Sequence, residues 1–125
     1  MHPDRERWNA KYRAGIHPSI CVNLIMHLDR LAKGRALDVA GGVGENAAVL
    51  ANAGFRVTLA DISDEGVLAA KRRSRGLRAD FGVVQADAAR LPFRTSFDTV
   101  LCTYFLDRSV DLASLLRPGG TLFVE

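Results

Sequence analysis

The sequence predicts an α/β domain built on a doubly wound, mostly parallel sheet, and three observations support this fold class. Five short apolar segments recur along the chain, and each is typical of a strand that is buried on both faces. Segments with helical spacing or helix-capping residues separate most of these strands. Third, because crossovers between parallel strands are right-handed, the segments between these strands are expected to lie on both faces of the sheet.

The 125 residues and 48% apolar content are typical of one globular domain, residues 1–125, without an internal repeat or linker. No apolar run approaches the roughly 20 residues of a membrane span, and the N-terminus is charged rather than signal-like. Cys21 and Cys102 lack metal-ligand spacing and are expected to be reduced core thiols. We therefore expect a cytoplasmic protein with neither a membrane partner nor a metal site.

A net charge of +3 is mild, and the densest basic run is residues 71–75. This run has two interpretations, a nucleic-acid surface and a solvated helix C-terminus whose cations oppose the helix dipole. No aromatic residues interleave with the basic residues to stack on bases. The second interpretation is favoured, and no nucleic-acid partner is expected.

Two N-terminal helices are expected within residues 3–33. Pro3 opens the first, a polar segment over 4–13 that Gly15 closes. The second begins at Pro18, and Gly34 ends it. Its apolar residues follow helical spacing at positions 20, 24, 28 and 31.

Strands and helices then alternate through the α/β core, residues 35–125. The expected strands cover residues 36–40, 56–60, 81–85, 97–102 and 121–124. The expected helices cover residues 45–53, 63–74 and about 109–116. Ser63 is suited to cap the second of these helices, and Gly54 to stop the first. A loop over 87–94 precedes the fourth strand, and a turn over 117–120 precedes the fifth.

Residues 37–44, Leu-Asp-Val-Ala-Gly-Gly-Val-Gly, are the most informative segment for function. Glycines let the main chain turn tightly and approach a ligand closely. A helix begins at once with Glu45, so its free N–H groups point into the same space. The next strand leads to Asp61, whose carboxylate can accept hydrogen bonds from two ribose hydroxyls. The arrangement predicts a nucleoside site at the carboxyl ends of parallel strands.

The kind of nucleoside has two interpretations. Residues 42–47 match Gly-x-Gly-x-x-Ala, and with Asp61 they keep an NAD-linked oxidoreductase open. Asp38, however, would repel a pyrophosphate and suits a ligand that carries an ammonium and a sulfonium. Asp87, after the third strand, can accept from an adenine amino group. The Arg-Pro-Gly-Gly turn at 117–120 has no evident role in dinucleotide binding.

These segments resemble the motifs of the class I S-adenosylmethionine-dependent methyltransferases. Residues 37–44 resemble the first motif, 61–63 (Asp-Ile-Ser) the second, and 87–88 with 91–93 the third. Residues 97–100 are similar to the family's fourth strand, and 117–122 to its fifth. The resemblance covers residue 20 to the end, and it implies the strand order 3-2-1-4-5.

A finer resemblance concerns Trp8 and Tyr12, taken together with residues 103–106 and Arg108. This pairing is similar to the small-molecule branch that includes the tellurite-resistance and thiopurine methyltransferases. The resemblance implies S-adenosyl-L-methionine as cofactor and a small-molecule methyl acceptor. Tyr104 and Arg108 are placed where an acceptor would pass.

The resemblance also implies a set of cofactor-binding residues. They are Asp38, Ala40, Gly42, Gly44, Asp61, Ile62, Asp87, Ala88, Cys102 and Thr103. Asp61 would hold the ribose diol and Ile62 one adenine face, while Asp87 and the Ala88 N–H would bind the adenine edge. Gly42 and Gly44 would pack along the methionine portion, whose ammonium Asp38 would hold directly or through water. The backbone near Cys102 and Thr103 would complete that end. No catalytic base is identified.

The sequence departs from the family pattern at two places. Ala40 replaces the first glycine, and its methyl is expected to be tolerated because position 40 should still lie in the strand. Family members also add a helix and two strands after the fifth strand, where this chain ends at Glu125. The fifth strand would then be an exposed edge, so a homodimer or a covering partner is expected.

Three functions follow from these observations: methyl transfer to a small molecule, a cofactor-binding module that is active only with a partner, and an NAD-linked oxidoreductase. Simpler structural roles compete for several residues. Asp38 and Asp61 could cap helices, Asp87 could be a turn residue, and Trp8 and Tyr12 could pack on the body rather than cover the cofactor. Asp98 is expected to be structural. The histidines at 2, 17 and 27 are expected to be surface or core residues.

Overall fold

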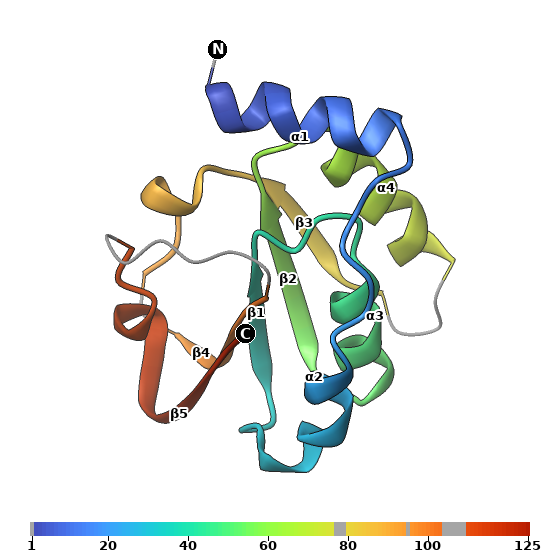
Figure 1. Ribbon diagram of the computed structural model, residues 1–125. Helices are drawn as coiled ribbons and strands as arrows, with labels where there is room; N and C mark the ends of the chain where they lie inside the picture. The colour runs from blue at the N-terminus through green and yellow to red at the C-terminus, as the bar shows by residue number, and fades with distance from the viewer. Residues whose placement is uncertain (1, 77–79, 95, 104–109) are drawn as a thin grey trace.

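Five parallel strands form one sheet in the order β3-β2-β1-β4-β5, which confirms the predicted fold class and strand order (Figure 1). The computed structural model describes all residues except 1, 77–79, 95 and 104–109. The strands are β1 (Arg35–Val39), β2 (Arg56–Asp61), β3 (Gly82–Gln85), β4 (Phe97–Cys102) and β5 (Leu116–Val124). Val39 at the end of β1 is level with Ala60 on one side and Cys102 on the other. The carboxyl ends of the three central strands therefore meet at one edge.

Within the described residues, four α-helices and three short 3₁₀ helices surround this sheet. The α-helices are α1 (Pro3–Arg13), α2 (Val22–Met26), α3 (Glu45–Asn52) and α4 (Asp64–Arg75). The 3₁₀ helices are η1 (Leu28–Arg30), η2 (Ala88–Arg90) and η3 (Ala113–Leu115). Ser63 caps α4 as predicted, because its hydroxyl accepts a hydrogen bond from the Gly66 N–H at 3.0 Å. The basic run at 71–75 lies in the last turns of the same helix, also as predicted.

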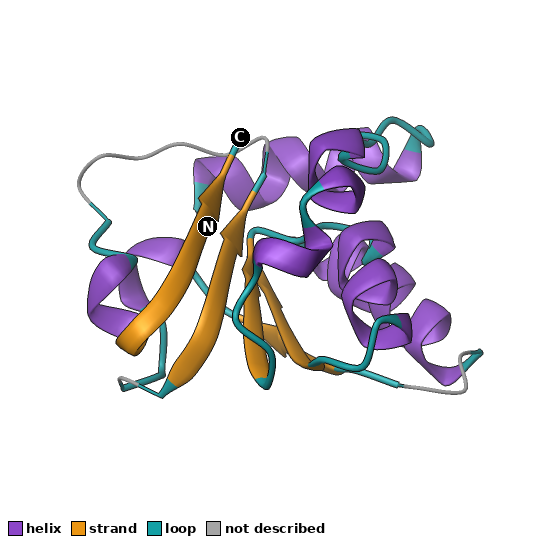
Figure 2. Cartoon of the chain, turned by 90° about the horizontal axis from the view of Figure 1, so that it is seen from below, coloured by secondary structure: helices purple, strands orange, loops and turns teal. Residues whose placement is uncertain are grey.

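Two apolar clusters hold the layers together, one on each face of the sheet. On one face, Leu50 of α3 and Ala70 of α4 pack against Leu59 of β2. On the other, Leu37 and Val100 pack against residues that include Leu115 of η3. Figure 2 shows helical ribbon on both sides of the strands, with most of it on one side. In the described part of the second face, short 3₁₀ helices and loops provide the cover in place of the predicted α-helix.

Two predicted helices are shorter than expected. The helix predicted over 18–33 is divided at His27 into α2 and η1. A ring nitrogen of His27 lies 2.7 Å from the Asn23 carbonyl, the group that the helix would use for its next backbone bond. The helix predicted over 109–116 begins outside the described residues, and within 110–116 only η3 is helical.

The last strand begins at Leu116 rather than at the predicted Thr121. The turn predicted over 117–120 instead forms part of β5, with a register shift opposite Phe97 and Thr99. Asp98 explains this extension, because its carboxylate accepts hydrogen bonds from Arg117 and, at 2.7 Å, from the Arg35 N–H. This carboxylate ties β1, β4 and β5 together at the end remote from the glycine turn, which confirms its structural role.

Candidate functional site

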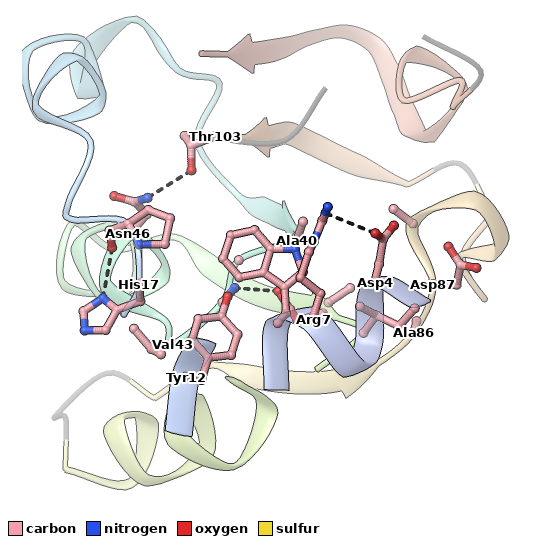
Figure 3. Close-up of a pocket in the computed structure, with 18 of the residues that line it drawn as sticks. Asp4, Arg7, Tyr12, His17, Ala40, Val43, Asn46, Ala86, Asp87 and Thr103 are labelled. Atoms are coloured by element: carbon pink, nitrogen blue, oxygen red, sulfur yellow. Dashed lines mark hydrogen bonds and ion pairs between the residues drawn. The ribbon is translucent and has the colours of Figure 1, made fainter. Parts of the chain in front are cut away.

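A pocket of about 450 Å³ opens at the carboxyl ends of β1 and β2 (Figure 3). The glycine turn after β1, the segment after β3 and helix α1 form its walls. Seven of the ten predicted cofactor-binding residues line it: Ala40, Gly42, Asp61, Ile62, Asp87, Ala88 and Thr103. The other three, Asp38, Gly44 and Cys102, lie behind this lining. Segments distant in sequence thus converge on one cavity, as expected for the carboxyl edge of a parallel sheet.

The glycine turn is held tightly against the two strands. A side chain at Gly41 would place its Cβ 2.7 Å from both an oxygen of Asp38 and the side chain of Leu59. Gly42 adopts a φ of 61°, which glycine reaches without steric cost. Ala40 also has a positive φ, 54°, and lies beyond the end of β1. The expectation that position 40 lies in the strand is therefore wrong, and its methyl group is carried in a strained conformation.

Asp61 joins the end of β2 to this turn. One of its oxygens accepts a hydrogen bond from the Gly42 N–H at 2.8 Å, and the other accepts from the Ser63 N–H at 2.8 Å. The residue is only 6% exposed. Burial raises the pKa of the carboxyl, while the backbone donors at Ser63, Gly42 and Ile62 act in the opposite direction. Each oxygen retains acceptor capacity beyond these bonds, and the residue lines the pocket.

Asp38 lies beneath the turn instead of on the pocket wall. It is fully buried, and neither of its oxygens has a hydrogen-bond partner. Burial, and then the nearby charge of Asp61, raise its pKa to about 8. The two acids therefore lie on the same edge, but they face different surroundings. At neutral pH, Asp38 is therefore mostly protonated.

Gly44 and Cys102 have packing roles in the structure. A Cβ at Gly44 would lie 2.9 Å from the Phe81 ring, so this glycine makes room for the ring at the start of α3. The Cys102 side chain is buried, and its carbonyl accepts from the Glu125 N–H at 3.1 Å. Burial, and then Asp38, raise the pKa of the Cys102 thiol to about 11, so it stays protonated at neutral pH. Neither cysteine forms a disulfide, in agreement with the sequence.

Asp87 is both a capping residue and a wall of the pocket. One oxygen accepts from the Ala89 N–H at 2.9 Å and begins η2, and the other lies 3.3 Å from a ring nitrogen of His2. Ala88 follows it along the same wall. The capping contacts leave Asp87 partly exposed, with further acceptor capacity.

Thr103 and Asn46 link the far side of the pocket to the segment before α2. The Asn46 amide donates to the Thr103 hydroxyl at 3.1 Å, and its oxygen accepts from the Cys21 N–H at 2.9 Å. Both residues line the pocket. Tyr104 and Arg108, predicted to lie near a passing acceptor, are outside the described residues.

Helix α1 supplies a wall that sequence reasoning only partly anticipated. Trp8 and Tyr12 both line the pocket, and their rings stack with centroids 5.5 Å apart. The helix also packs on α4, so the two predicted roles, packing on the body and covering the site, occur together.

Sequence reasoning missed the polar wall residues His2, Asp4, Arg7, His17, Ser19, Glu45 and Asn46. Figure 3 shows Asp4, Arg7, His17 and Asn46 on either side of Tyr12. The expectation for His2 and His17 is thus incomplete, because both are at the pocket. The sequence offered one signal that α1 lies at the pocket, the i, i+4 pair of Trp8 and Tyr12. The position of α1 over the sheet edge is a tertiary feature, so the polar residues of this wall could not be predicted.

Comparisons with known proteins agree with this geometry. A family model described as a methyltransferase domain matches residues 37–124. The chain is 36% identical over 104 residues to a ubiquinone biosynthesis O-methyltransferase of Xanthomonas euvesicatoria, covering 76% of this chain and 44% of that protein. It is 39% identical over 99 residues to a demethylmenaquinone methyltransferase of Beutenbergia cavernae, covering 72% and 39%. The chain therefore spans less than half the length of these curated relatives.

A solved structure extends the similarity to the whole chain. An S-adenosylmethionine-dependent methyltransferase from Thiobacillus denitrificans, in complex with S-adenosyl-L-homocysteine, superposes with a TM-score of 0.75 at 25% identity. The match covers 99% of this chain and 56% of that one. These relatives do not support the finer resemblance to the tellurite-resistance and thiopurine branch.

Proposed function

Because the chain belongs to the methyltransferase domain family, we propose that the pocket binds S-adenosyl-L-methionine and that the domain transfers its methyl group to a small molecule. The observation that carries this proposal is the carboxylate of Asp61, held on the pocket wall by the Gly42 and Ser63 N–H groups. A ribose diol needs such an acceptor at such a turn. Asp38 fits the same ligand, because an unpartnered buried carboxyl favours a cationic group nearby.

The remaining site residues are assigned by the chemistry of their positions. Ile62 lies next to Asp61 on the wall and offers an apolar surface to the adenine ring. Asp87 accepts from the adenine amino group, and the Ala88 N–H donates to a ring nitrogen. Thr103, at the far side of the pocket, adjoins the methionine portion. These assignments are proposals that follow the residue order of the family motifs.

Binding and orientation account for most of the expected rate enhancement. When bound, the cofactor supplies a methyl group on a sulfonium, which is a good leaving group for in-line displacement. The pocket's task is to hold donor and acceptor in line, and positioning of this kind contributes up to about 7–11 kcal/mol in favourable cases. A thiolate, an amine or another ready nucleophile needs no general base from the protein.

The acceptor is proposed to be a small aromatic molecule. Two observations support this class: the names of the relatives, which concern quinone biosynthesis, and the stacked rings of Trp8 and Tyr12 on the pocket wall. An aromatic ring packs favourably against such a pair.

Calorimetry with S-adenosylmethionine, S-adenosylhomocysteine and NAD tests the cofactor. We expect the two adenosyl ligands to bind and NAD to give no heat; binding of NAD alone would favour the oxidoreductase. Transfer of a labelled methyl group to a panel of phenols, quinols, thiols and amines then tests activity. Binding without transfer to any of these acceptors would favour a cofactor-binding module that needs a partner.

The exposed edge of β5 favours a dimer as the active form. Leu122 and Val124 on this strand are 41% and 46% exposed, and an edge strand presents unpaired backbone groups that a second copy can meet. Sedimentation at increasing concentration is expected to show a dimer. A monomer throughout would contradict this proposal and leave the cofactor proposal intact.

A further inference from the structure

Gly66, in the first turn of α4, has a role that helix formation does not explain. Glycine within a helix is less favourable than alanine. A Cβ at this position would lie 2.8 Å from the Cε2 atom of Tyr12 and 3.3 Å from its Cδ2 atom. The ring of Tyr12 therefore rests directly on the α4 backbone, in a slot that exists only because residue 66 has no side chain.

The hydroxyl end of the same ring lies over the glycine turn. A Cβ at Gly42 would be 2.8 Å from the Tyr12 hydroxyl oxygen. Asp61 is close by, and burial together with its charge raises the pKa of Tyr12 well above its usual range. The hydroxyl therefore stays protonated and is able to donate. Tyr12 spans the distance from α4 to the turn and lines the pocket between them.

The other contacts that hold α1 are polar, and most are exposed to solvent. Arg5 pairs with Asp64 at 2.7 Å, and Arg13 with Glu65 at 3.1 Å. Asn9, the only buried residue of the helix, accepts from the Ser63 hydroxyl at 2.6 Å. Exposed ion pairs contribute little to stability and are weakened by salt. Asn9 also accepts from the Glu65 N–H at 3.1 Å, so the buried Asn9 contacts and the packing of the Tyr12 ring on Gly66 together set where α1 lies over the pocket.

We propose that Gly66 is a positioning residue which seats Tyr12 over the glycine turn, and that Tyr12 donates a hydrogen bond to the bound cofactor. The proposal rests on the proposed function, because it names a further residue of that same cofactor site. It assigns to α1 a direct part in binding and makes a glycine outside the pocket a determinant of affinity.

Gly66→Ala is the central test, with S-adenosylhomocysteine as the probe. Alanine favours the helix, which offsets part of the cost of displacing the ring, so the variant should stay folded, as its melting temperature will check. Affinity should nevertheless fall by about tenfold, because the ring and its hydroxyl are displaced together. Gly76→Ala is the matched control at the end of the same helix, where the nearest atom to an added Cβ is 3.5 Å away. It should leave affinity unchanged.

Tyr12→Phe separates the hydroxyl from the ring. Loss of the hydroxyl alone should weaken binding by about fivefold, the effect of one hydrogen bond. In the double variant Gly66→Ala/Tyr12→Ala, binding should be no weaker than in Tyr12→Ala, because both changes remove the same contact. Trp8 provides an independent readout. It is the single tryptophan of the chain and stacks on Tyr12, so its emission should shift in Gly66→Ala without ligand.

The outcomes distinguish this inference from the function on which it rests. If the wild-type protein fails to bind S-adenosylhomocysteine, the proposed function and the inference are both overturned. If the wild type binds and Gly66→Ala binds equally well with unchanged Trp8 emission, only the inference is overturned. If the losses of affinity from Gly66→Ala and Tyr12→Ala were additive in the double variant, the inference would also be overturned, because Gly66 would then affect binding independently of Tyr12.

Discussion

Asp38 and Asp61 lie near the carboxyl ends of neighbouring strands, with Asp38 level with Leu59, two residues before Asp61, and their surroundings are opposite. Asp61 accepts two backbone hydrogen bonds and lines the pocket. Asp38 is equally shielded from water, but its oxygens have no partner and the turn covers it. The Gly42 N–H, which follows Asp38 in the chain, donates to Asp61 instead. The turn after β1 is thus held by the acid after β2, and one carboxyl is satisfied while the other is not.

This difference assigns the two acids different roles. Burial raises the pKa of Asp61 and its backbone donors oppose this rise; under the proposed function this carboxyl receives the ribose hydroxyls. A buried carboxyl without donors favours the neutral form until a cation approaches. Under the proposed function, a cationic nucleoside would therefore be favoured by two acids, Asp61 on the pocket wall and Asp38 beneath the turn.

Replacing Asp61 with alanine should produce the largest effect. The Gly42 and Ser63 N–H groups would lose their acceptor, which costs about 1–3 kcal/mol of unfolding free energy for a buried group. The affinity for S-adenosylhomocysteine should fall by roughly 10- to 100-fold as the ribose acceptor is lost. Urea denaturation and calorimetry measure the two quantities. Unchanged affinity in a folded variant would overturn the assignment of Asp61.

Replacing Asp38 with asparagine should change the pH dependence of stability. The native pKa is raised from 3.8 to about 8, so the native state holds this proton over a range in which the unfolded chain has lost it. The contribution of this proton to the free energy of unfolding is complete below pH 3.8. It is lost as the pH rises toward 8, by up to about 1.4 kcal/mol per pH unit. Denaturation at several pH values between 5 and 8 should show this decline in the wild type.

The Asp38→Asn variant lacks the titrating proton, so its unfolding free energy should be nearly level over the same interval. Cys102→Ser serves as a control beside the same carboxyl and should keep the slope. Equal slopes in the wild type and Asp38→Asn would show that Asp38 is ionised in the folded protein.

Replacing Ala40 with glycine should have the smallest effect, because it relieves strain without altering either acid. The left-handed conformation disfavours an alanine side chain by about 1–2 kcal/mol, and glycine removes this cost. Part of the resulting gain in stability is offset by the greater freedom of glycine in the unfolded chain. We expect the variant to be more stable by about 0.5 kcal/mol. A melting temperature below that of the wild type would contradict the strain at this position.

The local elements, and the edge of the sheet on which the pocket lies, could be predicted from the order of the residues. Short apolar strands, the Ser63 cap and the glycines after β1 act over a few residues, so their effects are visible in the chain. The strand order and the position of Asp61 beside the turn followed from the motifs. Most of the pocket lining could be predicted because parallel strands necessarily bring their carboxyl ends to one edge.

Which groups at that edge are hydrogen-bonded to one another, and which segment covers them, depends on long-range packing and could not be predicted. Whether the Gly42 N–H donates to Asp38 or to Asp61 depends on the strand register, and no local pattern encodes it. The same holds for α1: its Tyr12 meets Gly66 across more than fifty residues of chain. Long-range contacts of this kind arise from packing. The close approach of the Phe81 ring to Gly44 is another such contact, and it could not be predicted from the glycine motif.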